Sequence, residues 1–243
     1  MIEKKVKAEI QFLEGPQNRW KNFTYALSIF YEYIKGFRAL HFVGPCVTIF
    51  GSARFKEDHE YYKQAREVAG AIAKMGFTIM TGGGPGIMEA ANRGAKDVGG
   101  KSVGCNIVLS HEQHPNAYLD KWVNIKFFSV RKILLIKYSY AFVVMPGGFG
   151  TLDEFFQSLT LVQTKKISMF PIIIFDREFY QKLLEHNNRM MAAGTIAAED
   201  EKLYLVTDSI EETVAYIKDK SIMAFGLKYM QPKKPFWGFF EKR

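Results

Sequence analysis

The sequence has little cysteine and no long apolar run, and both shortages narrow the class of protein. Its 243 residues include two cysteines, Cys46 and Cys105, each within an apolar, strand-like run. We interpret them as reduced core residues of a cytoplasmic protein, with a disulfide or metal pair as the alternative. No apolar stretch approaches the ~20 residues that span a bilayer, and residues 1–12 lack the apolar core of a secretory signal. We therefore expect no membrane partner.

Three familiar site motifs are also missing. No glycine-rich turn reads G-x-G-x-x-G with an acidic residue about twenty positions later, which disfavours an NAD-type oxidoreductase. None reads G-x-x-x-x-G-K-[ST], which disfavours triphosphate hydrolysis. The histidines show no H-E-x-x-H spacing, and the cluster HEQH at 111–114 is more simply a surface loop than a metal site. We expect no metal and no cofactor.

Positive charge is in excess, with a formal net charge of +8. A basic protein attracts anions such as nucleic acids and small phosphates. Apart from EKKVK and the tail MQPKKPFWGFFEKR, the basic residues are spread among acids rather than forming one stripe. We therefore expect a small-molecule partner and no nucleic acid. A nucleic-acid-binding module is an alternative that salt-dependent binding to DNA would favour.

Short apolar runs alternate with helical segments from residue 46 onward. Runs such as CVTIF, FTIMT, YAFVVM and FPIIIFD are typical of strands buried on both faces. Because helices separate them, the pattern predicts a Rossmann-like α/β fold, with a doubly wound parallel sheet in a three-layer α-β-α arrangement. We expect a single domain with an N-terminal helical segment (1–44, its helix over 18–40), a core (45–220) and a C-terminal tail (221–243).

Three predicted strands end in small residues and lead directly into a helix, as FGSA, TGGGPG and PGGFGT. Glycine lets a ligand approach the backbone, and a helix start offers free N–H donors and partial positive charge. Ligands bind such sheets at the carboxyl ends of the strands. The turns therefore predict a phosphate site, with ordinary turn chemistry as the alternative. Its candidate residues are Gly51, Ser52, Gly82, Gly83, Gly84, Gly147, Gly148, Gly150 and Thr151, the last also expected to cap its helix.

Charged residues accompany the third turn. Glu154 is predicted in the first helical turn after it, where capping is the simpler role. Arg131 and Lys132 fall in the first turn of the preceding helix, where cations are disfavoured unless an anion or solvent is near. A mononucleotide with one phosphate fits this combination.

The segments PGGFGTLDE, SVRK and GGGPGIMEAANRGA together resemble the LONELY GUY family of cytokinin-activating phosphoribohydrolases, often labelled lysine decarboxylases. The resemblance covers about residues 45–190. It implies a Rossmann-like homodimer that hydrolyses the N-glycosidic bond of nucleoside 5'-monophosphates, such as AMP or a cytokinin ribotide, to free base and ribose 5-phosphate. Arg131 and Glu154 would be the catalytic pair, and Lys132, the 147–151 loop and Thr160 would contact substrate.

Some residues depart from the family pattern. Phe149 stands where Tyr is common, Asp153 where Glu is common, and Glu89 where plant-type members carry Gly. We expect Glu89 near the base, Asn92 among the residues that bind substrate and Glu112 near the ribose, so cytokinin specificity stays open. Lysine decarboxylation normally needs pyridoxal phosphate on an activated lysine, and no lysine pattern here supports it. The alternative function is a non-catalytic mononucleotide sensor or carrier.

Overall fold

The computed structural model describes residues 9–109, 114–167 and 170–223. Within these ranges seven strands form one sheet, in the order β4-β3-β2-β1-β5-β6-β7, and every neighbouring pair is parallel. The predicted doubly wound parallel sheet is confirmed. The strands are β1 (Cys46–Phe50), β2 (Thr78–Thr81), β3 (Ser102–Ile107), β4 (Lys121–Ile125), β5 (Ser139–Val144), β6 (Ile172–Phe175) and β7 (Leu205–Thr207).

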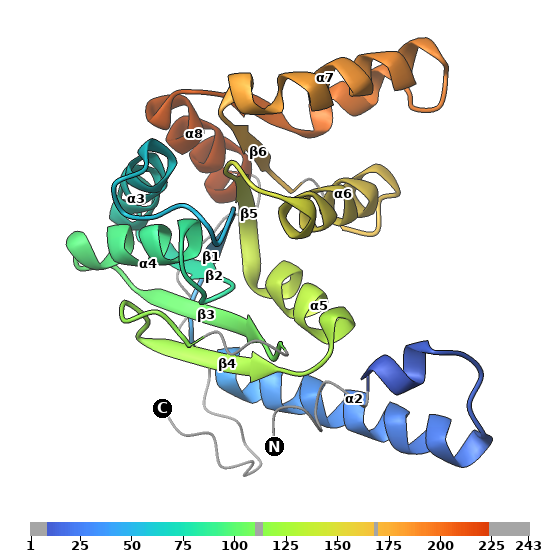
Figure 1. The fold of residues 1–243 in the computed structure, drawn as a ribbon. Helices are drawn as coiled ribbons and strands as arrows, with labels where there is room; N and C mark the ends of the chain where they lie inside the picture. Colours follow the sequence, from blue (N-terminus) through green and yellow to red (C-terminus); the bar gives the residue numbers. More distant parts are fainter. Residues whose placement is uncertain (1–8, 110–113, 168–169, 224–243) are drawn as a thin grey trace.

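Helices cover both faces of the sheet and make the predicted three layers (Figure 1). One face carries α2 (Arg19–Leu40), α5 (Phe128–Tyr138), α6 (Phe149–Gln163) and α7 (Arg177–Ala192). The other carries α3 (Glu60–Lys74), α4 (Ile87–Asp97) and α8 (Ile210–Ile217). Two short segments were not predicted: the 3-10 helix η1 (Ala198–Leu203) and the π-helix η2 (Lys218–Met223).

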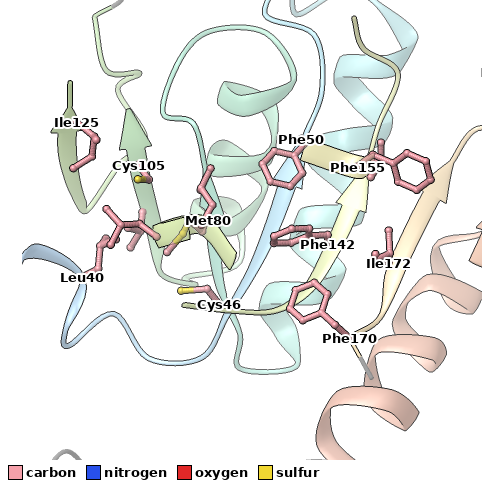
Figure 2. Close-up of a cluster of buried hydrophobic side chains, with 14 of the residues drawn as sticks. Leu40, Cys46, Phe50, Met80, Cys105, Ile125, Phe142, Phe155, Phe170 and Ile172 are labelled. Carbon is pink, nitrogen blue, oxygen red and sulfur yellow. The ribbon is translucent and has the colours of Figure 1, made fainter. Parts of the chain in front are cut away.

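The central strands are buried on both faces, as their unbroken apolar runs predicted. In β5, Ala141 and Val143 point to one hydrophobic cluster, whereas Phe142 and Val144 point to the other. Figure 2 shows Phe142 next to Phe50 of β1, with ring centroids 4.9 Å apart. Because side chains alternate along a strand, each strand fills two cores and holds the helices of both layers.

Both cysteines belong to this core. Cys46 and Cys105 are buried, free thiols, and burial raises the pKa of each to about 12. The interpretation of both as reduced core residues therefore agrees with the structure. Among the helices of the described ranges, none is long and apolar enough to cross a bilayer.

The chain order reverses between β1 and β5, which lie side by side at the centre of the sheet. From β1 the chain winds outward through β2 and β3 to β4, and then returns to β5 and winds the other way. Such a reversal leaves a crevice at the carboxyl ends of the two central strands, because their connections leave in opposite directions. The first and third glycine-rich turns follow these two strands.

The start of α4 shows one local deviation from a common pattern. Proline is common in the first turn of a helix, but Pro85 lies outside α4, which begins at Ile87 with Gly86 as its N-cap. Gly86 has a φ of +69°, and a β-carbon there would lie 2.5 Å from the carbonyl oxygen of Ser52. Gly86 therefore stays outside the helix, and α4 starts at the next residue.

We predict that Gly94→Ala destabilises the fold. Gly94 of α4 packs against α3 so closely that a β-carbon would overlap the backbone carbonyl oxygen of Arg66. Overpacking of this kind costs about 1–3 kcal/mol, and backbone cannot rotate away. Urea unfolding measures the loss. The control is Gly150→Ala, a helical position with open space around its β-carbon, which should keep or slightly raise stability. Equal midpoints for both variants would contradict the prediction.

Candidate active site

The three glycine-rich turns meet at the carboxyl edge of the sheet. The backbone N–H of Ser52, after β1, donates to the carbonyl oxygen of Pro146, after β5, at 3.0 Å. The N–H of Ile87, which follows the β2 turn, donates to the carbonyl oxygen of Ser52 at 2.9 Å. Residues separated by nearly a hundred positions in the sequence are thus joined by two backbone hydrogen bonds. The structure brings together the turns on which the predicted phosphate site depends.

At some glycines in these turns, side chains from other parts of the chain pack so closely that a β-carbon would not fit. A β-carbon at Gly82 would lie 2.6 Å from Nη2 of Arg131 and 2.7 Å from the sulfur of Met88. A β-carbon at Gly147 would overlap the side chain of Thr151, and one at Gly51 would overlap Ile87. Close packing therefore explains these three positions without a ligand.

The start of α6 has the features of an anion site. Gly148 is its N-cap, and no described side chain caps the helix. Gly148, Phe149 and Gly150 are exposed, and 94% of Phe149 is open to solvent. The first N–H groups of a helix lack intrahelical acceptors and carry partial positive charge. This helix start can therefore receive a phosphate.

Thr151 and Glu154 lie deeper in α6 than the sequence predicts, because the helix starts two residues earlier, at Phe149. Thr151 is the third helical residue and is only 6% exposed, so its predicted role as a cap is wrong. Glu154 belongs to the second turn rather than the first. A simple capping role for Glu154 is thereby disfavoured, whereas the contact of Thr151 with a ligand stays a prediction.

Arg131 and Glu154 form a largely buried ion pair. Nη1 of Arg131 lies 2.8 Å from Oε1 of Glu154, and the two side chains are 11% and 10% exposed. Nε of Arg131 also donates to the carbonyl oxygen of Cys105 in β3, at 2.9 Å. The guanidinium therefore joins the end of β3 to α6 and has few alternative positions. The two residues proposed as a catalytic pair from motif resemblance are in direct contact.

Burial raises the pKa of Glu154, although the charge of Arg131 acts in the opposite direction. Removing a carboxylate from water disfavours its charged form, and here that cost exceeds the attraction of the nearby cation. A buried carboxyl with a raised pKa holds a proton more readily than an exposed one. Such a group is better suited than an exposed carboxyl group to accept a proton.

The core fixes the position of Glu154. Its neighbour Phe155 is fully buried, and Figure 2 shows it among the apolar side chains that α6 shares with the sheet. Ser158, one turn further, is also buried and donates its hydroxyl to the backbone carbonyl of Glu154 at 2.6 Å. Because α6 is anchored by this face, the backbone of Glu154 is held in a fixed position beside Arg131.

A second ion pair lies beside the first and was missed in the sequence. Nζ of Lys132 lies 2.7 Å from the carboxylate of Asp153, and both side chains are more exposed than the first pair. The signal was present, because two adjacent cations on one helix face two adjacent acids on another. Lys132, a predicted phosphate contact, is therefore neutralised by Asp153 in this structure, and its contact with substrate stays a prediction.

Asn92 and Glu89 occupy supporting positions. Asn92 is fully buried beneath the β2 turn, where its side-chain oxygen accepts hydrogen bonds from Thr81 at 2.7 Å and Asn116 at 2.9 Å. Asn116 also donates to the carbonyl oxygen of Gly84 at 3.0 Å, a role that the sequence did not reveal. Glu89 accepts from the hydroxyl of Tyr62 at 3.0 Å. These bonds shape the turn, and direct contact with substrate stays a prediction.

Thr160 is not brought to the ion pair. It is exposed about three turns along α6, donates to the carbonyl oxygen of Phe156 at 2.8 Å, and lines a pocket between α6, α7 and η1. Glu112 lies outside the described residues. Across the described ranges, no three His, Cys, Asp or Glu side chains gather as metal ligands.

Known proteins resemble this chain in sequence and in fold. A cytokinin riboside 5'-monophosphate phosphoribohydrolase of Rhodococcoides fascians is 29% identical over 176 residues, which cover 71% of this chain and 88% of the relative. A pyrimidine/purine nucleotide 5'-monophosphate nucleosidase of Escherichia coli is 25% identical, covering 65% of this chain and 37% of the relative. The molybdenum cofactor binding protein of Rippkaea orientalis matches with a TM-score of 0.54 at 20% identity, covering 72% and 94% of the two chains, and shows the shared fold.

The model of the family described as "Possible lysine decarboxylase" matches residues 88–217, more than half of the chain. This range contains Arg131, Glu154 and the third glycine-rich turn. The chain therefore belongs to this LONELY GUY-type family, as its PGGFGTLDE motif predicted.

Proposed function

We propose that the protein hydrolyses the N-glycosidic bond of a nucleoside 5'-monophosphate and releases free base and ribose 5-phosphate. The observation that carries this proposal is the buried Arg131–Glu154 pair beside the uncapped start of α6. Relatives named as phosphoribohydrolases and a nucleosidase support the same class of reaction. We further propose that the substrate is of the AMP or cytokinin ribotide type.

The phosphate binds at the start of α6. The exposed N–H groups after Gly148 supply hydrogen bonds, and the helix supplies partial positive charge. Lys132 exchanges Asp153 for the phosphate, which is possible because the side chains of both residues are partly open to solvent. The phosphate is remote from the bond that breaks, and the energy of its binding holds the ribose in place.

Glu154 acts on the sugar. Breaking the C1'–N bond leaves positive charge on the ribose ring, and a carboxylate stabilises it as in glycoside hydrolysis. The base departs with the bonding electron pair and takes up a proton. A water oxygen adds to C1' and gives one proton to the carboxylate of Glu154, which returns it to solvent.

Arg131 orients this carboxylate. A guanidinium does not lose its proton in proteins, so it is a poor general acid. Its hydrogen bonds to Glu154 and to the carbonyl oxygen of Cys105 instead fix the direction in which the carboxylate faces. No lysine of the described residues is needed for this chemistry beyond the phosphate contact proposed for Lys132.

For the proposed function, we first predict that Glu154→Gln binds AMP but releases base about 10²–10⁴-fold more slowly. This is the range expected when a positioned proton-transfer group is removed. Calorimetry measures binding, and chromatography measures free base. Glu185→Gln on α7 removes an exposed carboxylate that pairs with Lys182 and should keep full activity. Unchanged turnover in Glu154→Gln would remove Glu154 from the mechanism. Binding of AMP without any release of base by the wild type would favour the alternative, a non-catalytic sensor or carrier of mononucleotides.

A second prediction concerns pH. Because Glu154 acts as a carboxylate and its pKa is raised, kcat should rise with pH across a limb that lies above about pH 4.5. The charge of Asp153 contributes to the raised pKa of Glu154. Asp153→Asn should therefore move the limb to lower pH, measured at saturating AMP. If the limb of kcat does not move in Asp153→Asn, it reports the titration of another group, such as the substrate phosphate.

A third prediction concerns the substrate class. Incubation with nucleoside monophosphates, the matching nucleosides and lysine should yield base and ribose 5-phosphate from the monophosphates alone, because the phosphate supplies the binding energy. Relative rates across adenine, other bases and N6-substituted adenines identify the preferred base. Cadaverine from lysine, or equal cleavage of unphosphorylated nucleosides, would contradict the proposal.

A further inference from the structure

The pocket between α6, α7 and η1, here called the α6–α7 pocket, lies apart from the ion pair. α6 contributes four of its lining residues: Phe156, Leu159, Thr160 and Gln163. With about 100° between successive residues, these side chains lie roughly 140–240° around the helix from Glu154. Glu154 itself contacts Arg131 of α5. The pocket and the candidate active site are therefore on opposite sides of one helix.

The α6–α7 pocket has the size and surface of a site for a small organic molecule. Its volume is about 160 Å³, and an apolar cavity of about 150 Å³ is large enough to hold benzene. Most of its wall is apolar and includes Met190, Met191, Leu203 and Tyr204. Thioether side chains adapt their shape and make favourable contacts with aromatic rings. One aromatic or branched aliphatic group fits this space.

A buried oxygen in the wall lacks a hydrogen-bond donor. Asn187 of α7 lines the pocket and is only 4% exposed. Its Nδ2 donates to the hydroxyl of Tyr204 at 3.0 Å, whereas its Oδ1 has no partner among the residues that the structure describes. An unpaired acceptor in the interior is costly, so a ligand that brings an N–H or O–H donor to Asn187 is favoured.

The charged groups of the α6–α7 pocket are all acidic. Asp200 and Glu201 of η1 belong to the lining, and the lining residues that the structure describes include no Lys, Arg or His. Glu201 is exposed and therefore lies at the rim. The hydroxyl of Thr160 already donates its proton to the carbonyl oxygen of Phe156, so towards a ligand it acts as an acceptor. A phosphate or carboxylate would be repelled here, whereas a cation is attracted.

We propose that the α6–α7 pocket binds a small hydrophobic amine. Its apolar group lies among the thioether and aromatic side chains, and its nitrogen donates a hydrogen bond to Oδ1 of Asn187. The carboxylates of Asp200 and Glu201 favour the protonated form of the amine. Size, charge and the unpaired acceptor all select this class, and none of the three depends on the hydrolase activity proposed above.

Three probes that share a phenyl ring and a three-carbon chain test the ligand class: 3-phenylpropylamine, 3-phenylpropanol and 3-phenylpropionate. Ligand-observed NMR titration measures their affinities for the full chain. The amine should bind at least about tenfold more tightly than the carboxylate, with the alcohol between them, because only the carboxylate meets like charge and lacks a donor. Equal affinities for amine and carboxylate, or no binding of the amine at millimolar concentration, would overturn the proposal.

Substitutions in the lining locate the bound probe. Glu201→Gln should weaken binding of the amine about two- to fivefold, as expected for a solvent-exposed charge pair, and leave the alcohol unaffected. Glu199→Gln removes the charge of a neighbouring acid of η1 outside the lining and is the matched control. Asn187→Leu keeps the volume but removes the acceptor, and should weaken the amine about tenfold. An amine that binds Glu201→Gln and Asn187→Leu as tightly as the wild type would place its site elsewhere.

Filling the pocket gives an independent test. Ile196→Trp places a larger side chain at a half-buried lining position and should abolish binding of the amine and the alcohol. A far-UV circular dichroism spectrum equal to that of the wild type confirms that this variant folds. Undiminished binding of the amine by the folded variant would contradict the proposal.

Competition with AMP separates this site from the proposed nucleotide site. Saturating AMP should not displace 3-phenylpropylamine, and Glu154→Gln should bind the amine as tightly as the wild type, because Glu154 faces the other side of α6. Amine binding in a protein that cleaves no nucleotide would reject the proposed hydrolysis alone. Displacement of the amine by AMP would assign the α6–α7 pocket to the nucleotide and overturn the proposal made here.

Discussion

The contact between Arg131 and Glu154 is the interaction on which the candidate site depends. A carboxylate this deeply buried needs a partner, because an unpaired charge in the interior is costly. The guanidinium supplies that partner while remaining tied to the carbonyl oxygen of Cys105. The same bond therefore compensates the burial of Glu154 and directs it towards the carboxyl edge of the sheet. The pKa of Glu154 is nevertheless raised, because the cost of removing its carboxylate from water exceeds the attraction of the guanidinium.

The surrounding fold explains why that contact forms. Arg131 reaches α6 because β5 returns the chain to the centre of the sheet beside β1, and this return sets α5 and α6 next to each other on one face. The fully buried Phe155 fixes the rotation of α6, and Gly82 leaves space for the guanidinium. Fold class and site are therefore linked: the reversal in chain order creates the crevice, and the core sets the direction of the charged groups within it.

The sequence predicted the sheet and the identity of the charged pair, because buried strands leave apolar runs and the motif has a fixed spacing. It did not predict that Asp153 pairs with Lys132, since such a contact depends on how two helices pack. It placed the start of α6 two residues too late, because it took Thr151 as the cap where Gly148 holds that position. It did not reveal that Gly82 and Gly147 are required by neighbouring side chains, because only the folded chain brings these close. The contact of the two glycines with a ligand stays a prediction. The buried support from Asn116 to the β2 turn leaves no pattern in the sequence.

Ser52 uses both of its backbone polar groups to hold the other two glycine-rich turns, one through its N–H and one through its carbonyl oxygen. Through two successive peptide units, Ser52 couples the three turns mechanically. Loops that are locked to one another in this way lose little further conformational entropy on binding. If the proposed phosphate binds at the start of α6, most of the ordering that its site needs is therefore complete before it arrives.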